Sequence, residues 1–532
     1  MPTLEWIGKE KVINHHQQVP FRVLDRQYSF DAEGCHEADN GSKNMIIRGD
    51  NLEALKALLP RYEGRVKCIY IDPPYNTGNE GWVYNDNVND PKIKKWLGQV
   101  VGREGEDLSR HDKWLCMMYP RLKLLQKLLA EDGVIFISID EIEHRFLELI
   151  MDEIFGMNNR IDTFVWQNNY GGGAKSNYIV HLHEYVLCFA KNLKTVGKIE
   201  LPPDESILKY YKYRDEKFEV RGPYRLQPLA TTSMDERPNL RYPLFFKGHE
   251  IWPEKQWFWS KERALEAQAN NELVFSERKG KWSVNYKQYL NALDGTERKS
   301  KPYSIISGIY TQSGTKTIKD IMGSGKAFDF PKPPELISHF IQMITDKEDI
   351  VLDSFAGSGT TAHAVLNMNK ADGGNRKFIL VEMMDYAESI TAERVRRVIR
   401  GYGEGKNAVP GTGGDFSFYD LGAVLLRPDG NLNEEIDIGR IREYIWYTET
   451  QEAMTPVTAP DNKYYLGTSK ETAYYFYYER KTVTTLDYAF LATVKKQADG
   501  YTIYADLCTL SDADLKKGNI TFKKIPRDIA KL

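Results

Sequence analysis

The stretch VKCIYIDPPY, residues 66–75, joins an apolar run to a turn that contains two prolines. Residues 66–71 have the length and composition of a buried strand. Pro73 and Pro74 cannot continue this strand, because each lacks a backbone N–H and has a fixed φ. Asp72 and Pro73 each precede a proline, which holds them in an extended conformation. The sequence therefore predicts a rigid turn that presents a carboxylate, a carbonyl and an aromatic ring at the carboxyl end of a strand.

Expected strands and helices alternate on both sides of this turn. The strands are expected at residues 44–48, 66–71, 133–139, 349–354 and 377–382, and the helices at 52–59, 112–129, 141–155, 363–368 and 386–400. Such alternation is typical of an α/β fold, in which helices cover both faces of a parallel sheet. Residues 163–325 lack the alternation and are rich in Trp, Tyr, Gly, Lys and Arg. The sequence therefore predicts two halves of one sheet that are separated by an inserted mixed α+β domain.

The expected domain boundaries follow from this pattern. The two halves of the sheet comprise residues 44–162 and 326–402, and the inserted domain comprises residues 163–325. The polar residues 1–43 are expected to form an N-terminal arm. Glycine-rich residues 403–414 are expected to form a linker, and residues 415–532 a small C-terminal domain.

Length and composition indicate a globular chain of several domains. A chain of 532 residues with 41% hydrophobic residues exceeds what one core usually organises. The sequence has no run of about 18 apolar residues, which predicts a cytoplasmic protein without a membrane segment. Its five cysteines are far apart and form no CxxC pair, which argues against a disulfide framework and a thiolate zinc site.

The net charge of -3 is unevenly distributed along the chain. Residues 201–330 contain 22 Lys and Arg against 17 Asp and Glu, a balance of +5. A basic middle region is typical of a protein that contacts DNA with one region only. Ordinary surface variation explains the same imbalance equally well, so charge alone does not decide between them.

Asp72-Pro73-Pro74-Tyr75 offers a chemistry as well as a turn. An aromatic amine such as adenine N6 is a poor nucleophile, because its lone pair is delocalised into the ring. The Asp72 carboxylate and the Pro73 carbonyl can accept the two amine hydrogens and localise that pair. Tyr75 can stack on a base outside the duplex, which offsets about 1–3 kcal/mol of the cost of extrusion. A plain turn is the alternative, and the position at the end of an apolar strand favours the amine clamp.

A second motif is LDSFAGSGTT, residues 352–361. Its glycines let a ligand approach the backbone, and the amino terminus of the following helix favours an anionic group. Glu382 ends the next strand, where an acidic side chain can bind ribose hydroxyls. Alone, this turn is compatible with NAD, FAD or S-adenosylmethionine. The amine clamp has no use in a nicotinamide enzyme, so the two motifs together predict a methyltransferase that uses S-adenosylmethionine and no metal.

Several segments resemble the amino-methylating DNA methyltransferases of the permuted β class, and within it the modification subunits of type III restriction-modification systems. The matching segments are IIRGDNLEALKALL, IYIDPPYNTGNEGWVYND, RHDKWLCMMYPRLKLLQKLLAEDGVIFISIDEIEHRFLELIMDEIFG, HEYVLCFAK, and FDFPKPPELISHFI with DIVLDSFAGSGTTAHAVL. They cover roughly residues 44–190 and 320–400. The resemblance implies a circularly permuted, Rossmann-like S-adenosylmethionine-dependent fold, with residues 163–325 as the target-recognition domain.

The resemblance also implies roles for individual residues. The catalytic clamp on the target base is expected to comprise Asp72, Pro73, Pro74 and Tyr75. The donor pocket is expected to be lined by Asp353, Phe355, Gly357, Ser358, Gly359 and Thr360. Glu382 is expected to bind the donor's ribose, Asp50 its adenine, and Lys332 is expected to lie beside its methionine end.

The activity implied by the resemblance is methylation of adenine N6 in double-stranded DNA, by a homodimer that has a helicase-nuclease restriction subunit as its partner. Cytosine N4 is an alternative target, because the tetrapeptide recognises an amino group rather than a particular ring. A DNA-recognition subunit that chiefly directs a helicase-nuclease is an alternative of another class. Methylation of RNA or of a protein amide is disfavoured, because an amide clamp begins with Asn rather than Asp. The chain is short for a type III modification subunit, which leaves the restriction partner open.

Overall fold

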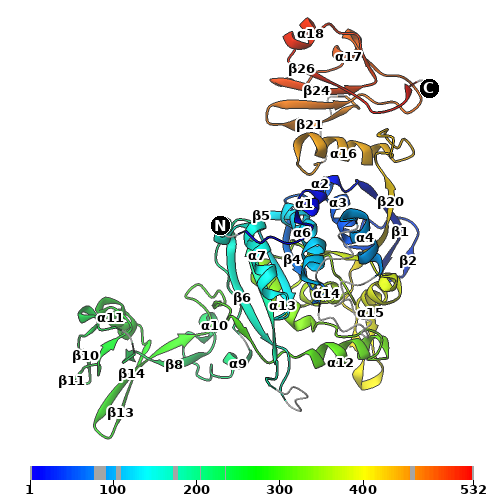
Figure 1. Cartoon of the computed structure of the whole chain (residues 1–532). Coiled ribbons are helices and arrows are strands. Elements are labelled where there is room, and N and C mark those ends of the chain that lie inside the picture. Colours follow the sequence, from blue (N-terminus) through cyan, green and yellow to red (C-terminus); the bar gives the residue numbers. More distant parts are fainter. Residues whose placement is uncertain are drawn as a thin grey trace. The chain divides into compact units, whose positions relative to one another are not determined.

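The computed structural model shows two compact units, one formed by residues 1–198 and 303–532 and the other by residues 199–302 (Figure 1). The described residues are 3–76, 91–102, 110–171, 178–203, 205–233, 235–455 and 462–529. No helix within these ranges is both long and apolar enough to cross a membrane.

The larger unit is built on a sheet whose described strands number 11, in the order β15-β6-β7-β5-β4-β16-β17-β3-β20-β1-β2. The strands are β1 (Arg22–Asp31), β2 (Cys35–His36), β3 (Met45–Arg48), β4 (Val66–Ile71), β5 (Leu129–Ile139), β6 (Arg160–Gln167), β7 (His183–Ala190), β15 (Ile305–Ile306), β16 (Ile350–Asp353), β17 (Lys377–Glu382) and β20 (Asp415–Val424). Neighbouring strands from β5 to β20 in this order are all parallel. Antiparallel strands extend both edges, β7 and β6 on one side and β1 and β2 on the other.

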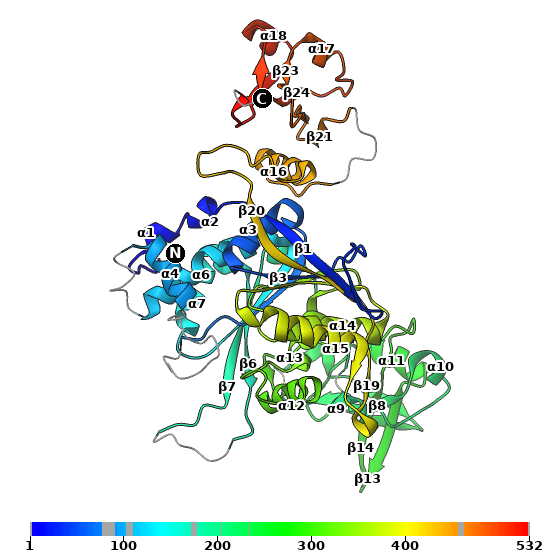
Figure 2. The same ribbon diagram turned by 90° about the vertical axis from the view of Figure 1, so that its right-hand side faces the viewer.

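Helices cover both faces of the parallel centre (Figure 2). The helices on one face include α3 (Asn51–Tyr62), α6 (Arg110–Leu128) and α7 (His144–Phe155), and those on the other include α13 (Pro334–Ile344), α14 (Thr360–Asp372) and α15 (Glu393–Arg400). Ile69 and Ile71 of β4 pack in the core with the first set. Tyr70 points to the opposite face and stacks on Phe340 of α13 with 6.2 Å between ring centroids. Both faces of β4 are therefore buried, which explains its continuous apolar sequence.

The N-terminal residues belong to the larger unit, so the expectation of a peripheral arm at residues 1–43 is wrong. Strand β1 pairs with β20 along nearly its whole length. Trp6, Val12 and Val19 are buried in the same core as α3 and α6. Short helices α1 (Lys9–Val12) and α2 (His15–Gln18) precede the strand. The polar composition that suggested an arm reflects a strand near the sheet edge, in which Asp25 and Gln27 are exposed.

The second compact unit is shorter than the inserted domain that the sequence predicts. Strands β6 and β7 lie within the expected insert at residues 163–325, yet they pair with each other and with β5 in the main sheet. Helix α12 (Thr311–Met322) also belongs to the larger unit. Only residues 199–302 form the separate unit. The expected boundary fell too early, because an antiparallel hairpin extends the sheet without the strand-helix alternation on which the prediction relied.

The unit of residues 199–302 has a core of its own. Its three-stranded antiparallel sheet has the order β13-β14-β8, and two-stranded pairs accompany it. The elements are α9 (Glu205–Leu208), α10 (Phe218–Arg221), β8 (Tyr224–Pro228), β9 (Ala230–Thr231), β10 (Leu244–Phe246), β11 (His249–Ile251), β12 (Gln256–Trp257), α11 (Lys261–Ala269), β13 (Leu273–Arg278) and β14 (Lys281–Tyr289). Leu229, Leu244, Trp257 and Val284 are buried together at its centre. The unit thus contains both helices and strands.

The C-terminal boundaries also differ from the expected ones. The expected linker at residues 403–414 includes β19 (Val409–Pro410), which pairs with β18 (Gly401–Tyr402). Strand β20 lies beside β3 in the main sheet, so the C-terminal elements proper begin after it. These are α16 (Ile438–Thr450), β21 (Tyr465–Ser469), β22 (Thr472–Phe476), β23 (Thr485–Leu486), α17 (Tyr488–Leu491), β24 (Gly500–Ala505), β25 (Leu507–Cys508), α18 (Asp512–Lys517) and β26 (Ile520–Lys524).

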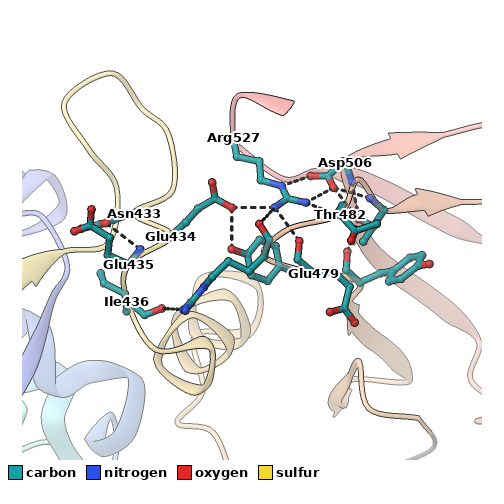
Figure 3. Close-up of polar contacts among 12 residues, drawn as sticks. Asn433, Glu434, Glu435, Ile436, Glu479, Thr482, Asp506 and Arg527 are labelled. Carbon is teal, nitrogen blue, oxygen red and sulfur yellow. Dashed lines mark hydrogen bonds and ion pairs between the residues drawn. The ribbon is translucent and has the colours of Figure 1, made fainter. Parts of the chain in front are cut away.

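A buried arginine near the C-terminus, Arg527, connects the segment before α16 to this C-terminal part through hydrogen bonds and ion pairs (Figure 3). Arg527 Nε donates to Asp506 Oδ1 at 2.6 Å, and Arg527 Nη1 donates to Glu434 Oε1 at 2.9 Å. Further donations go to the backbone carbonyls of Glu479 and Thr482. The Arg527 and Asp506 side chains are 1% and 0% exposed, so each charge depends on the other for compensation.

Candidate functional site

Four neighbouring parallel strands end at one edge of the sheet and bring the predicted motifs together. The strand order β4-β16-β17-β3 places Asp72 after β4, Asp353 at the end of β16 and Glu382 at the end of β17. Asp50 follows β3, where Arg48 is in register with Glu382. Ligands of parallel α/β sheets bind at the carboxyl ends of the strands. Segments that are more than 300 residues apart in the chain thus share one candidate site.

The tetrapeptide at residues 72–75 is a buried, anchored turn. The Asp72 side chain is 8% exposed, and Tyr75 is also 8% exposed. The indole Nε1 of Trp114, on α6, donates to the Pro74 carbonyl at 2.6 Å. Asn76 follows with a positive φ of 61° and donates through its amide to the Arg110 carbonyl at 3.2 Å. Residues 77–86 of the matching segment lie outside the described residues.

Lys332 reaches the tetrapeptide from the residue pair that precedes α13. Its Nζ lies 3.0 Å from Asp72 Oδ1 and donates to the Tyr75 hydroxyl at 2.7 Å. The same Nζ lies 3.3 Å from Glu184 Oε2, which accepts a hydrogen bond from the Tyr75 hydroxyl at 3.0 Å. Burial acts to lower the pKa of Lys332, but the Asp72 and Glu184 carboxylates raise it above its ordinary value. Lys332 is therefore an ammonium ion between two carboxylates.

The Lys332 ammonium contacts the amine clamp, because Pro333 and Pro334 start α13, which packs against β4. The expectation that Lys332 lies beside the methionine end of the donor stays a prediction. Glu184, at the start of β7, was not identified as a site residue from the sequence. The sequence signal was an acidic residue at the beginning of an otherwise apolar strand. Glu184 contacts Tyr75 only once β7 has paired with β5 in the folded chain.

The glycine-rich turn between β16 and α14 is held by its own side chains. Asp353 Oδ1 accepts from Phe355 N at 3.0 Å, and its Oδ2 accepts from the Thr361 hydroxyl at 2.5 Å. Burial raises the pKa of Asp353 to about 7. Gly357 and Gly359 have φ values of 51° and 80°, a region that disfavours side chains. Asp353 thus shapes the turn, while Gly357 and Gly359 permit its conformation.

The side chains of Ser358 and Thr360 in the turn are buried, and their hydroxyls contact α15. Ser358 and Thr360 are 2% and 5% exposed, and both accept hydrogen bonds from the buried Arg394. Thr391 donates to the Gly357 carbonyl at 2.6 Å. A Cβ atom on Gly359 would lie 3.1 Å from the Thr391 carbonyl oxygen, so the turn packs closely against this helix.

Glu382 and Asp50 carry the other two expected donor contacts. Glu382 Oε2 accepts from Gly357 N at 2.8 Å, and its Oε1 accepts from Met384 N at 2.9 Å. A carboxylate has about four acceptor positions, so it can accept from further hydroxyls. Asp50 caps α3 by accepting from Leu52 N at 2.9 Å and lies 3.3 Å from Arg121.

A cavity of about 590 Å³ is lined by Asp50 and by Met383, the residue that follows Glu382. Its lining includes Gly49 and Asp50 after β3, Met383 after β17, Leu52 of α3 and Trp96 of α4 (Pro91–Val100). A mainly apolar cavity with a few polar groups is typical of a small-molecule site. Trp96 was not expected there, because it lies in a polar segment without a motif. Within the described ranges, no three His, Cys, Asp or Glu side chains are grouped so that they can hold a metal ion.

Comparison with known proteins identifies the family to which the chain belongs. A family model described as DNA methylase matches residues 66–393, which include the tetrapeptide and the glycine-rich turn. The chain is 33% identical over 421 residues to the EcoPI Mod subunit, a type III restriction-modification enzyme of Escherichia phage P1. It is 34% identical over 392 residues to the type III StyLTI Mod subunit of Salmonella typhimurium. Each match covers 71% of this chain, but only 63% of the EcoPI subunit and 57% of the StyLTI subunit.

A third relative is matched over most of its length. The type II methyltransferase M.KpnI of Klebsiella pneumoniae is 33% identical over 371 residues, which cover 65% of this chain and 81% of that protein. The solved structure of the cytosine-N4-specific PvuII DNA methyltransferase superimposes with a TM-score of 0.33 and 16% identity, over 66% of this chain and 86% of that chain. That superposition is too loose to add to the sequence matches. By the extent of the family match and the identity to M.KpnI, this chain belongs to the DNA methylase family.

Proposed function

We propose that this chain transfers a methyl group from S-adenosylmethionine to the exocyclic N6 of an adenine flipped out of double-stranded DNA. The observation that carries the proposal is the shared edge of β4, β16, β17 and β3, where the amine clamp at residues 72–75 lies beside the glycine-rich turn and Glu382. Membership of the DNA methylase family supports DNA as the substrate. Asp at position 72 supports adenine over cytosine by family resemblance.

The residues around the cavity fit the methyl donor. The cavity beside Asp50 and Trp96 is suited to a flat ring, and Glu382 places a carboxylate, which can accept from ribose hydroxyls, at the end of β17. Gly357 and Gly359 let the amino-acid end approach the backbone at the amino terminus of α14. Bound there, S-adenosylmethionine supplies a methyl group made electrophilic by its sulfonium.

The tetrapeptide activates the target amine. The Asp72 carboxylate and the Pro73 carbonyl accept the two hydrogens of N6, so the nitrogen lone pair turns toward the methyl group. The Tyr75 ring stacks on the flipped base. A nitrogen–carbon bond forms as the carbon–sulfur bond breaks, and the nitrogen then releases a proton. Positioning provides most of the rate enhancement, because the amine needs no strong base before it reacts.

Lys332 and Glu184 complete the electrostatics of the clamp. The ammonium ion fixes the Asp72 carboxylate through Oδ1, 3.0 Å away, and Glu184 adds a second carboxylate to the group. Two negative charges therefore oppose one positive charge around the amine. The excess negative charge stabilises the positive charge that develops on the nitrogen as it takes the methyl group. In this proposal Glu184 acts as a positioning residue for Lys332 and Tyr75.

The test is methylation of unmodified duplex DNA by the purified chain, followed by mass spectrometry of the nucleosides. N6-methyladenine is expected, and Asp72→Ala is the matched control that yields none. N4-methylcytosine without N6-methyladenine would overturn the choice of base while leaving the clamp intact. Absence of any methylated nucleoside with the native chain would overturn the proposed function.

We also propose that the chain is the modification subunit of a type III-like system, as a homodimer in the cytoplasm with a helicase-nuclease partner. Relatives named as type III Mod subunits support this assignment. The unit of residues 199–302 is then the sequence-reading part, since it folds around a core of its own. Co-purification with the product of an adjacent helicase-nuclease gene tests the partner, and sedimentation measures the subunit number. An isolated gene and a monomer would contradict both points.

A further inference from the structure

A fully buried arginine stands behind the glycine-rich turn without a carboxylate partner. Arg394, on α15, is 0% exposed. Its Nη1 donates to Ser358 Oγ at 2.6 Å and to Thr360 Oγ1 at 2.7 Å, and its Nη2 lies 3.3 Å from His363 Nδ1. All three contacts are therefore with neutral or neutralisable groups on the turn and on α14.

Arg394 differs from the other buried arginines of the described chain because no carboxylate lies within ion-pair distance of it. Arg121, Arg376 and Arg527 lie within 3.3 Å of an aspartate oxygen, and Arg221 lies 2.6 Å from Glu272 Oε1. In the described part of the chain, Arg394 Nε has no hydrogen-bond partner. Burial lowers the pKa of Arg394 to about 9, which leaves it charged at neutral pH. A buried charge of this kind is costly unless an opposite charge binds close by.

His363 does not share or neutralise this charge. Burial lowers the pKa of His363 well below its ordinary value, and the nearby Arg394 lowers it further. The imidazole is therefore neutral and accepts from Arg394 through Nδ1. The Glu335 carboxylate attracts this charge from beyond ion-pair distance, so the positive charge of Arg394 is only partly compensated.

The positive charge of Arg394 and the positive end of the α14 dipole act at the same place, the glycine-rich turn. Ser358 and Thr360 accept from Arg394 and lie 3.3 Å apart, so one hydroxyl hydrogen serves the bond between them and the other is directed away from Arg394. Helix α14 spans 13 residues from Thr360, and its dipole adds positive potential at that residue. One remaining hydroxyl donor, a helix amino terminus and a buried guanidinium therefore all favour an anion at the turn.

We propose that Arg394 is a positioning residue that gives the turn at residues 353–361 its affinity for the carboxylate of the methyl donor, through Ser358 and Thr360 and without touching the donor. The inference rests on the proposed function, because it takes S-adenosylmethionine as the ligand. It predicts that the buried charge discriminates a donor that carries the carboxylate from one that does not.

The experiment compares two ligands on the full chain by calorimetry: S-adenosylmethionine and its decarboxylated form, which keeps the sulfonium and the amine. The native chain is expected to bind the carboxylated form at least about tenfold more tightly. In Arg394→Met this ratio is expected to fall to within about twofold of unity, while the affinity for the decarboxylated form hardly changes. Arg394→Lys, which keeps the charge, is expected to retain part of the preference.

The outcomes separate this inference from the proposed function. Equal affinity of the native chain for both ligands overturns the inference alone, and it needs no variant to fold. An equal loss of affinity for both ligands in Arg394→Met overturns it as well, because that result is expected of a purely structural residue. If Arg394→Met does not fold, as judged by its thermal transition, Ser358→Ala with Thr360→Val provides the same comparison. Failure of the native chain to bind S-adenosylmethionine overturns the proposed function itself.

Discussion

The glycine-rich turn at residues 353–361 and the amine clamp at residues 72–75 end neighbouring strands, yet the chain holds them in different ways. Most side-chain partners of the turn, Glu382, Thr391 and Arg394, belong to the next strand and helices along the chain, and one distant residue, Asn51, donates to the Ser354 carbonyl at 3.2 Å. The partners of the clamp come from three distant segments and are Trp114, Glu184 and Lys332. The glycine-rich turn is thus held mainly by its neighbours in sequence, whereas the clamp is assembled by the tertiary fold.

Because of this difference, we expect that substitutions can separate methyl transfer from donor binding. Changes in the clamp disturb contacts between distant segments and leave the strand-turn-helix unit of the donor side intact. Changes in the turn remove donor binding and leave the clamp's long-range contacts in place. Substitutions that act on one side only are therefore the sharpest tests of the comparison.

Asp72→Ala is expected to have the largest effect on the clamp and to abolish methyl transfer, because the amine loses its charged acceptor. Donor affinity, measured by calorimetry, is expected to stay within about threefold, because no donor-side contact changes. Asp72→Asn serves as a control of similar shape, and it too is expected to be inactive. Normal turnover by Asp72→Ala would remove Asp72 from the mechanism.

Gly357→Val is expected to have the largest effect on the donor side. Gly357 has a φ of 51°, where a β-branched side chain is strained, and the new side chain fills the position of close approach. S-adenosylmethionine binding is expected to disappear in calorimetry. Gly373→Val is a matched control, because Gly373 has a φ of 66° with no atom near the added Cβ and lies at the far end of α14. Equal donor affinity in the two variants would refute the placement of Gly357.

Glu184→Gln is expected to lower kcat by roughly tenfold, the equivalent of about 1.4 kcal/mol, because the excess negative charge around the amine is lost. The Kd of the donor is expected to stay the same, since Glu184 contacts only Lys332 and Tyr75 among the site residues. Single-turnover kinetics measure the step directly. Glu141→Gln, at an acid whose side chain is 43% exposed, is the control expected to change neither value. If kcat is unaltered in Glu184→Gln, Glu184 takes no part in activating the amine, and only the tetrapeptide and Lys332 form the clamp.

Arg527→Met lies away from both sides and is expected to have the smallest effect on methyl transfer per folded molecule. It should lower the free energy of unfolding by about 3–5 kcal/mol, because Asp506 is left as a buried, unpaired charge. Urea denaturation measures the change. Arg427→Met removes an ion pair whose acid is 85% exposed and is expected to cost less than about 1 kcal/mol. Similar losses in both variants would contradict the account of the buried pair.

Prediction from the sequence is most accurate for elements that a single continuous segment forms. The strand expected at residues 377–382 is found at those residues, and the run at 66–71 forms β4 as expected. Both are buried on two faces, so their apolar runs need no knowledge of partners. The pairing of β1 with β20 joins segments nearly 400 residues apart and leaves no local signal, which is why the N-terminal residues looked like an arm.

The candidate site shows the same limit. Asp72, Asp353 and Glu382 stand at strand ends and are visible as motifs. Lys332 was identified from the sequence, but its contact with Asp72 was not, because only the folded chain brings its ammonium ion to that carboxylate. Arg394 lies in a helix with three further arginines, Arg396, Arg397 and Arg400, and only its burial distinguishes it from the more exposed ones.

The central claim is that residues 72–75 clamp the N6 of an adenine for methylation. Methylation-aware sequencing of DNA from cells that express either the native chain or Asp72→Ala tests it most directly. We expect N6-methyladenine at one recurring sequence with the native chain and none with the variant. The same marks in both cells, or a mark on cytosine only, would contradict it.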